Sequence, residues 1–133
     1  FHSLMGEALR QCSRHEEAIP HFRDAKRLRP GELGNYVNLG WCYKRSGQLE
    51  QAIEELLEAE RVAGASKSDG YRALIHYNLS CYYALAGERE AMLDRLKQAL
   101  ELDPTYRDMI PDESDFDAFR QDPAFQQLAW LKV

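Results

Sequence analysis

One helical pattern is written three times in this chain, and the self-similarity constrains the fold more than any single residue does. The copies lie 34 residues apart between the first and the second, and 40 apart between the second and the third. Four sets of equivalent positions keep these intervals: Gly6, Gly40, Ser80; Ala18, Ala52, Met92; Phe22, Leu56, Leu96; and Ala25, Ala59, Ala99. Four positions in a single register indicate a repeated unit of two helices.

The residue types at these positions suit antiparallel helix pairs. Two helices approach closely only where one of them offers a small side chain, because the interaxial distance follows side-chain size. In repeat 2, Leu39 and Tyr43 lie one helical turn apart and fill the space between the helices. Gly47 and Gly87 are predicted to end the first helix of their repeats in the left-handed conformation, which carries no Cβ penalty for glycine.

The second helices have stop signals of their own. Pro30 and Pro104 are predicted to end them in repeats 1 and 3, and Gly64 in repeat 2. The six additional residues between repeats 2 and 3 fall within the Gly/Ser-rich segment VAGASKSDGYRA, residues 62–73. This segment predicts either a longer loop or extended helix ends.

With its register in place, the pattern resembles the tetratricopeptide repeat. The resemblance rests on HSLMGEAL, YVNLGWCY and HYNLSCYY at residues 2–9, 36–43 and 76–83, each followed by the small residues of a second helix. It covers about residues 1–104. It implies an all-α fold, a right-handed superhelix of three antiparallel helix pairs in one domain, residues 1–133. The expected repeats are 1–32, 33–66 and 73–106, with a C-terminal capping segment at 107–133.

The chain departs from the family pattern at three positions. His2 and His76 take the place of the usual aromatic residue, and Met92 takes the place of a small alanine. Methionine adapts to irregular gaps, so we expect a slightly displaced helix in repeat 3 rather than a lost repeat.

The residues after Pro104 do not spell a fourth repeat. Asp122 and Pro123 predict a helix start, because aspartate is a good N-cap and proline suits the first helical position. Phe125, Leu128 and Leu131 then form an apolar stripe. We predict that this segment caps the array, because a terminal repeat otherwise exposes an apolar face.

An acidic cluster precedes the predicted capping helix, with members Asp112, Glu113, Asp115 and Asp117. It lacks the glycine and the distant glutamate of an EF-hand loop. We therefore predict helix caps and a solvated loop here, with no metal and no cofactor.

No catalytic motif is recognisable in the sequence. GxSxG, HExxH and a phosphate-binding glycine loop are all absent. The four histidines (His2, His15, His21 and His76) do not form a metal pattern, and His76 lies five residues from Cys81, on a different helix face. We predict a non-enzyme; a catalytic domain elsewhere in a longer chain is a third and weaker alternative.

Charge and amino-acid composition indicate which classes of partner are not expected. Acidic residues outnumber basic ones 22 to 17, giving a net charge of −5 and a pI near 5.4. Nucleic-acid modules usually carry a basic patch and a high pI, so no nucleic-acid partner is expected. No apolar run is long enough for direct membrane insertion. Three widely spaced cysteines without CxxC favour reduced thiols and a cytoplasmic location. The sequence begins at Phe1 rather than Met, so we expect it to be a piece of a longer protein, in which an upstream signal or anchor is an open alternative.

The first helices of such repeats line the concave side of the superhelix. The predicted partner-binding residues are Arg10 in repeat 1, Val37, Asn38, Trp41, Lys44 and Arg45 in repeat 2, and Tyr77, Asn78 and Cys81 in repeat 3. Ser3, Glu7, Gln11, Ala84 and Leu85 extend the same side.

Two of these residue types leave alternatives open. Asn38 and Asn78 either pair with the backbone of an extended peptide or bond to a neighbouring repeat. Trp41 is either a binding hot spot or packs on an adjacent helix. A known groove of this family clamps the C-terminal carboxylate of heat-shock chaperones with two Lys, two Asn and an Arg. Asn38 matches one of them, but the basic residues are absent, so that ligand is not expected.

The sequence therefore predicts a module that binds a protein or peptide partner in its concave groove. The alternative is a structural spacer or self-association unit with its groove filled internally.

Overall fold

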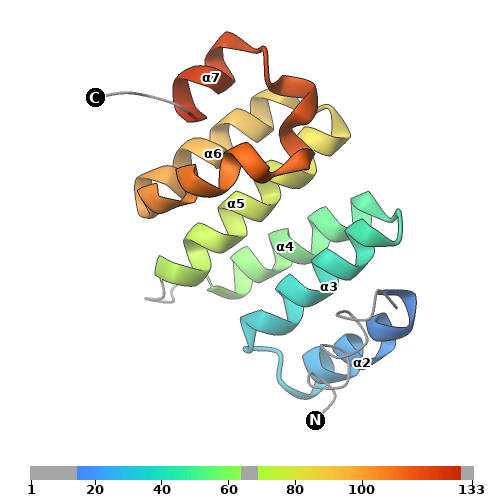
Figure 1. The fold of residues 1–133 in the computed structure, drawn as a ribbon. Coiled ribbons are helices and arrows are strands. Elements are labelled where there is room, and N and C mark those ends of the chain that lie inside the picture. Colours follow the sequence, from blue (N-terminus) through green and yellow to red (C-terminus); the bar gives the residue numbers. More distant parts are fainter. Residues whose placement is uncertain (1–14, 64–68, 130–133) are drawn as a thin grey trace. The chain divides into compact units, whose positions relative to one another are not determined.

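The computed structural model describes residues 15–63 and 69–129, and every element in these ranges is helical (Figure 1). The chain divides into two compact units, an N-terminal unit of residues 1–66 and a C-terminal unit of residues 67–133. The first helix predicted for repeat 1 lies outside the described residues, as do Gly64 and Leu131. The prediction of an all-α fold built from antiparallel helix pairs is confirmed.

Three described helices form the N-terminal unit: α2 (His15–Leu28), α3 (Leu33–Arg45) and α4 (Leu49–Ala63). Helix α3 packs against both α2 and α4. The repeat positions Ala18, Phe22, Leu39, Ala52 and Leu56 are fully buried in this unit.

Gly40 marks the close crossing of α3 and α4. A Cβ atom at this position would lie 3.4 Å from the Ala52 carbonyl oxygen and 3.4 Å from Leu56 Cγ. A Cβ would thus already be in van der Waals contact with α4, so a larger side chain would push the two helices apart. The small residue predicted at the crossing is therefore required there by packing.

Left-handed glycines end both first helices, as predicted. Gly47 has a φ of 81° and Gly87 a φ of 77°. The backbone N–H of Gln48 donates to the Tyr43 carbonyl at 2.7 Å, and that of Glu88 donates to the Tyr83 carbonyl at 2.9 Å. These bonds satisfy carbonyls that the helix end would leave unpaired.

Two helices begin the C-terminal unit, α5 (Asp69–Ala86) and α6 (Arg89–Leu102), and they pack against each other. Helix α5 has 18 residues against 13 in α3. It begins four residues before Ala73, the equivalent of the first residue of α3. Two alternatives were open for residues 62–73, a longer loop or extended helix ends. Residues 69–73 are an extended helix end.

Proline follows the second helices at the predicted places. Helix α2 ends at Leu28, two residues before Pro30, and α6 ends at Leu102, two residues before Pro104. Pro104 then opens a further element, because proline is well suited to the first helical position.

The capping segment is more helical than predicted. Two 3₁₀ helices, η1 (Pro104–Asp112) and η2 (Ser114–Phe119), precede α7 (Pro123–Ala129). The Asp122 carboxylate accepts hydrogen bonds from the backbone N–H groups of Ala124 at 2.9 Å and Phe125 at 3.4 Å. The N-cap predicted at Asp122 is therefore confirmed.

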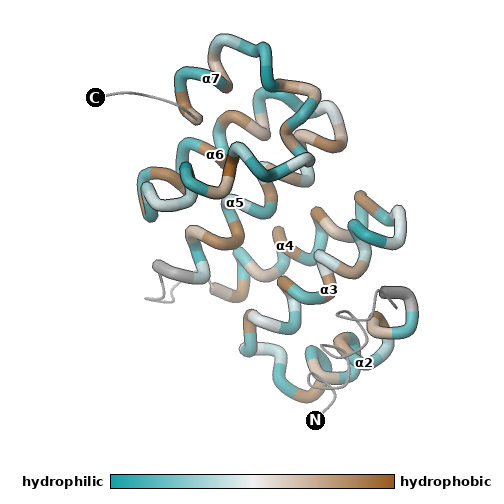
Figure 2. The backbone as a smooth tube through the Cα atoms, viewed as in Figure 1, coloured by the Kyte–Doolittle hydropathy of each residue, from teal (hydrophilic) through white to brown (hydrophobic). Residues whose placement is uncertain are grey.

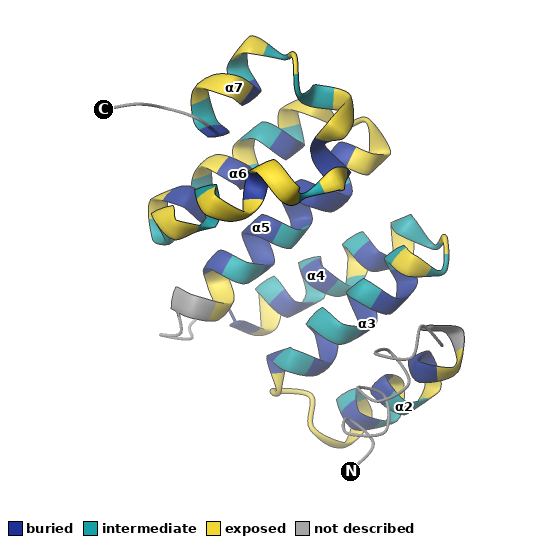
Figure 3. Cartoon of the chain, viewed as in Figure 1, coloured by how far each residue is buried: buried dark blue, intermediate teal, exposed yellow. Residues whose placement is uncertain are grey.

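Aromatic residues join this segment to α5. The Tyr77 ring stacks on Tyr106 with centroids 4.8 Å apart, and it meets the edge of Phe116 at 6.0 Å. Phe116 packs on Phe125 at 5.2 Å. Hydrophobic positions recur along the helices (Figure 2), and the buried positions follow them, most continuously on α5 (Figure 3). The apolar side of repeat 3 is covered by residues 104–129, as a cap requires.

Within residues 15–63 and 69–129, no helix is both long enough and apolar enough to span a bilayer.

Candidate protein-binding face

Five of the predicted binding residues share one side of α3. Their spacing places them on neighbouring turns of the helix, and each retains solvent exposure: Val37, Asn38, Trp41, Lys44 and Arg45. The opposite side of the helix is buried in the N-terminal unit. We call these five residues the α3 face.

The centre of the α3 face is an aromatic side chain beside a cation. The Arg45 guanidinium carbon lies 5.6 Å from the centroid of the Trp41 ring, in the range of a cation–π contact. Lys44 and Arg45 occupy the last turn of α3, where positive charge interacts favourably with the helix dipole. The face therefore combines an apolar plane with local positive charge on a chain of net charge −5.

Tyr77 and Cys81 are not exposed in the same way. They lie one turn apart on α5, and each side chain is only 2% exposed. Residues of η1 and η2 lie over this side of the helix, with Tyr106 stacked on the Tyr77 ring. The structure corrects the expectation that these two residues line an open groove, because the chain's own capping segment covers them.

The remaining predicted residues differ in their surroundings. Asn78 is half-buried and Leu85 is exposed on α5, whereas Ala84 is buried. Arg10 lies outside the described residues, as do Ser3, Glu7 and Gln11. His76 is buried, with its Nδ1 atom 3.1 Å from a terminal guanidinium nitrogen of Arg95 on α6. This contact fits the packing role predicted for the histidine.

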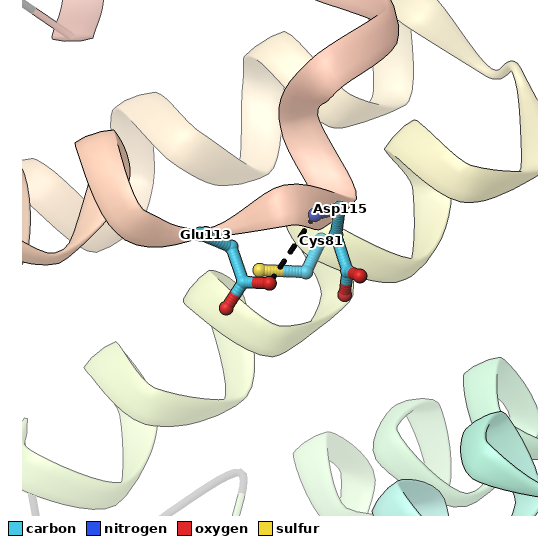
Figure 4. Close-up of side chains that lie close together, drawn as sticks. All are labelled: Cys81, Glu113 and Asp115. Atoms are coloured by element: carbon cyan, nitrogen blue, oxygen red, sulfur yellow. Dashed lines mark hydrogen bonds between the residues drawn. The ribbon is translucent and has the colours of Figure 1, made fainter.

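Sequence reasoning missed a group of side chains beneath the capping segment. The Cys81 Sγ atom and one carboxylate oxygen each of Glu113 and Asp115, all potential metal ligands, lie within 4.8 Å of one another (Figure 4). Glu113 caps η2 by accepting from the Asp115 backbone N–H at 3.3 Å. Asp115 is only 6% exposed, so the prediction of a solvated loop is wrong at this residue. Asp112 and Asp117 are exposed, as predicted.

The Tyr77 hydroxyl lies near the same three side chains. Its oxygen is buried and has no hydrogen-bond partner. Burial raises the pKa of Tyr77, and the nearby charges of Cys81, Glu113 and Asp115 raise the pKa further. The side chain is therefore neutral, with its polar atom next to this group.

Comparison with known sequences decides the family. The sequence profile of the tetratricopeptide repeat matches residues 33–65 and 73–106, which cover α3 with α4 and most of α5 with all of α6. The chain belongs to the tetratricopeptide repeat family. Its members generally mediate protein–protein interactions.

Two named relatives share repeats with the chain. Human anaphase-promoting complex subunit 7 is 40% identical over 63 residues, which cover 47% of this chain and 11% of that protein. The human protein O-mannosyl-transferase TMTC3 is 30% identical over 114 residues, covering 84% of this chain and 12% of that protein. The present chain thus spans about a tenth of the length of each of these relatives.

A solved structure has the same fold. The Yersinia enterocolitica type III secretion chaperone SycD, in complex with a peptide of the translocator YopD, superimposes with a TM-score of 0.72. The match covers 88% of each chain at 17% identity, so the likeness shows the fold alone.

Proposed function

We propose that this tetratricopeptide repeat protein binds a peptide segment of a partner protein on the α3 face. The observation that carries the proposal is the partly exposed Trp41 with the Arg45 guanidinium in cation–π distance of its ring. Tryptophan and arginine are the residue types most enriched among binding hot spots. A rigid helix presents both side chains, so little conformational entropy is lost when a partner packs on them.

The chemistry of the face suggests the chemistry of the partner. Trp41 and Val37 offer apolar contact, and Lys44 with Arg45 offers positive charge. A matching segment carries an aromatic or large aliphatic residue next to an acidic one. Asn38, one turn before Trp41, supplies a donor and an acceptor to the backbone of such a segment. The structural relative SycD was solved with a bound peptide, which supports a peptide as the class of ligand.

A second candidate function is self-association or a purely structural role. The observation that favours it is in the C-terminal unit, where Tyr106 and Phe116 already cover Tyr77. In that unit the chain supplies its own occupant for one side of a first helix. A second copy of the chain that packs on Trp41 would cover the α3 face, as the capping segment covers Tyr77.

We infer further that the chain acts without catalysis and in a reducing compartment. Cys42 and Cys81 are buried thiols outside any disulfide, which supports the latter. TMTC3 is named a transferase, but the present chain spans only 12% of it.

The test is a selection of peptides followed by mapping of the surface they contact. A peptide library is screened on the immobilised chain, and the recovered sequences are expected to pair an acidic residue with an apolar one. Amide chemical shifts of the isotope-labelled chain are then followed as one such peptide is added. Perturbations concentrated on Val37, Trp41 and Arg45 support the proposal, whereas perturbations confined to α4, α6 or α7 overturn it.

The molar mass of the chain in solution distinguishes self-association from peptide binding. Light scattering over a range of chain concentrations measures the molar mass without any peptide. A stable dimer that the substitution Trp41→Ala dissociates would favour self-association through the α3 face. A monomer that binds the selected peptide favours the primary proposal.

A further inference from the structure

A group of three potential ligand atoms lies between α5 and the capping segment, and the proposed partner binding does not use it. The Cys81 thiol comes from α5, and the Glu113 and Asp115 carboxylates come from the start of η2 (Figure 4). All three ligand atoms lie within 4.8 Å of one another. Cys81 and Asp115 are buried and Glu113 is half-buried. Two carboxylates so close together repel each other when both are ionised, and burial increases the repulsion.

An independent feature at the same place is the Tyr77 hydroxyl. The Tyr77 side chain is 98% buried, given its 2% exposure, and its oxygen has no hydrogen-bond partner. A buried polar atom left without a partner carries a desolvation penalty. The hydroxyl lies close enough to Cys81, Glu113 and Asp115 for their charges to act on it. A ligand bound by these three side chains would also give the Tyr77 hydroxyl a partner.

We propose that Cys81, Glu113 and Asp115 bind a divalent transition-metal ion of the Zn²⁺ type, with the Tyr77 hydroxyl facing the ion or a water on it. A thiolate ligand selects such a borderline ion over Ca²⁺ and Mg²⁺, which take oxygen ligands. The thiol proton is released to solvent on binding. Three protein ligands with a fourth position open to water is a common zinc arrangement.

The distances require only small movements. Zinc bonds of about 2.3 Å to sulfur and about 2.1 Å to oxygen place tetrahedral ligand atoms roughly 3.5 Å apart. The present separations, all within 4.8 Å, exceed this by up to about 1.3 Å. On ion binding, the Glu113 and Asp115 side chains would rotate to close this gap. The half-buried Glu113 leaves a route by which the ion can enter.

Such an ion would fix the capping segment to α5. It would bond α5 to residues that lie 32 and 34 positions later in the chain, in addition to the aromatic contacts of Tyr77. Binding to the folded state alone raises the melting temperature by linkage. The ion would therefore stabilise the C-terminal unit and hold Tyr77 and Cys81 covered.

The experiment is calorimetric titration of the reduced chain with Zn²⁺, together with the absorption spectrum of the Co²⁺ form. A Cys12→Ser/Cys42→Ser background leaves Cys81 as the one thiol. We expect one ion per chain, a higher melting temperature, and a thiolate-to-cobalt charge-transfer band that Cys81→Ser removes. Ca²⁺ should produce none of these effects.

The variants Glu113→Gln and Asp115→Asn remove a charge and change the shape little. Each is expected to weaken Zn²⁺ binding by at least the 10- to 100-fold that loss of an outer-shell partner typically causes. Asp112→Asn, at an exposed neighbouring carboxylate, is the matched control and should bind as the parent does. Circular dichroism checks folding. Glu113→Gln decides the matter if Asp115→Asn unfolds, because its amide oxygen still accepts from the Asp115 N–H. Absence of binding by the parent, equal binding by Glu113→Gln, or a Co²⁺ form of the Cys81-only background that lacks the charge-transfer band overturns the proposal.

Discussion

The Ser80 hydroxyl donates a hydrogen bond to the Met92 carbonyl oxygen at 3.0 Å, across the α5–α6 crossing. The equivalent positions in the other complete repeat are Gly40 and Ala52, where a Cβ at Gly40 would lie 3.4 Å from the Ala52 carbonyl oxygen. A small residue faces the same carbonyl in both helix pairs. The repeat register read from the sequence therefore corresponds to a repeated contact in space.

Gly40→Leu should be far more destabilising than Arg45→Leu. The leucine side chain would overlap Ala52 and Leu56 at the α3–α4 crossing, and overpacking of this kind costs about 1–3 kcal/mol or more. Arg45 is exposed, so its substitution should lose only its cation–π contact with Trp41 and its helix-dipole interaction, about 1 kcal/mol in all. Urea denaturation of both variants measures the difference. Equal stabilities would mean that the two sides of α3 are assigned wrongly.

Ser80→Ala tests the hydrogen bond apart from the packing. Alanine fits the crossing but removes the donor to the Met92 carbonyl, so we expect a loss of about 0.5–1.5 kcal/mol. Ser80→Leu should be worse, for the reason that applies to Gly40. If Ser80→Ala is as stable as the parent while Ser80→Leu is not, packing alone explains the small residue. Thermal and urea unfolding provide the comparison.

The repeats were predictable because their signals are local. Glycine at Gly47 and Gly87, and proline at Pro30 and Pro104, act on the backbone within a few residues. The two 3₁₀ helices were missed because residues 104–119 have no regular hydrophobic period. Phe116 is buried by Tyr77, 39 positions earlier, and no local pattern reports such a contact. The spacing of Tyr106, Ile110 and Phe116 was the one sign of a segment with an apolar side.

Deletion of residues 114–133 should destabilise the C-terminal unit by several kcal/mol. It removes the fully buried Phe116 and Phe125, and burial of each large apolar side chain contributes about 1.5–3 kcal/mol. Phe116→Ala removes one of these side chains and leaves a cavity, with an expected loss of about 3–5 kcal/mol, so the deletion should cost at least as much. Differential scanning calorimetry gives the melting temperatures. A truncated chain that melts as the parent does and remains monomeric would refute the capping role.

The Arg89–Asp122 ion pair should make stability depend on acid pH. The Arg89 guanidinium hydrogen-bonds the Asp122 carboxylate and, with the backbone N–H groups of Phe125 and Ala124, lowers the pKa of Asp122. A carboxyl with a lowered folded-state pKa stabilises the fold above its unfolded-state pKa. This contribution disappears as the pH falls through the folded-state value.

Arg89→Ala should therefore raise the pKa of Asp122 toward its ordinary value. It should also raise the pH at which the Asp122 contribution is lost. A carbon-detected NMR titration of the Asp122 carboxyl measures this directly. An unchanged pKa in the variant would show that the backbone N–H groups, and not Arg89, determine the titration.

The surroundings of the candidate binding residues were predictable only in part. The α3 face follows from helical spacing; Arg45 is exposed and the other four residues are half-buried. Tyr77 and Cys81 have the same spacing on α5 and are buried, because the capping segment returns over that helix. The proximity of Cys81 to Glu113 and Asp115 depends on that same tertiary contact. Periodicity identifies one side of a helix but does not reveal what covers it.

The measurement that tests the central proposal most directly is calorimetric titration of a selected peptide into the parent chain and the Trp41→Ala variant. If the α3 face is the binding site, Trp41→Ala should weaken binding by about 2 kcal/mol or more, which is roughly 30-fold in Kd. The control is Arg27→Ala, which replaces an exposed arginine on α2, and it should bind as the parent does. Circular dichroism confirms that both variants keep their helix content. A folded Trp41→Ala variant that binds the peptide with the parent's affinity would contradict the assignment of the α3 face.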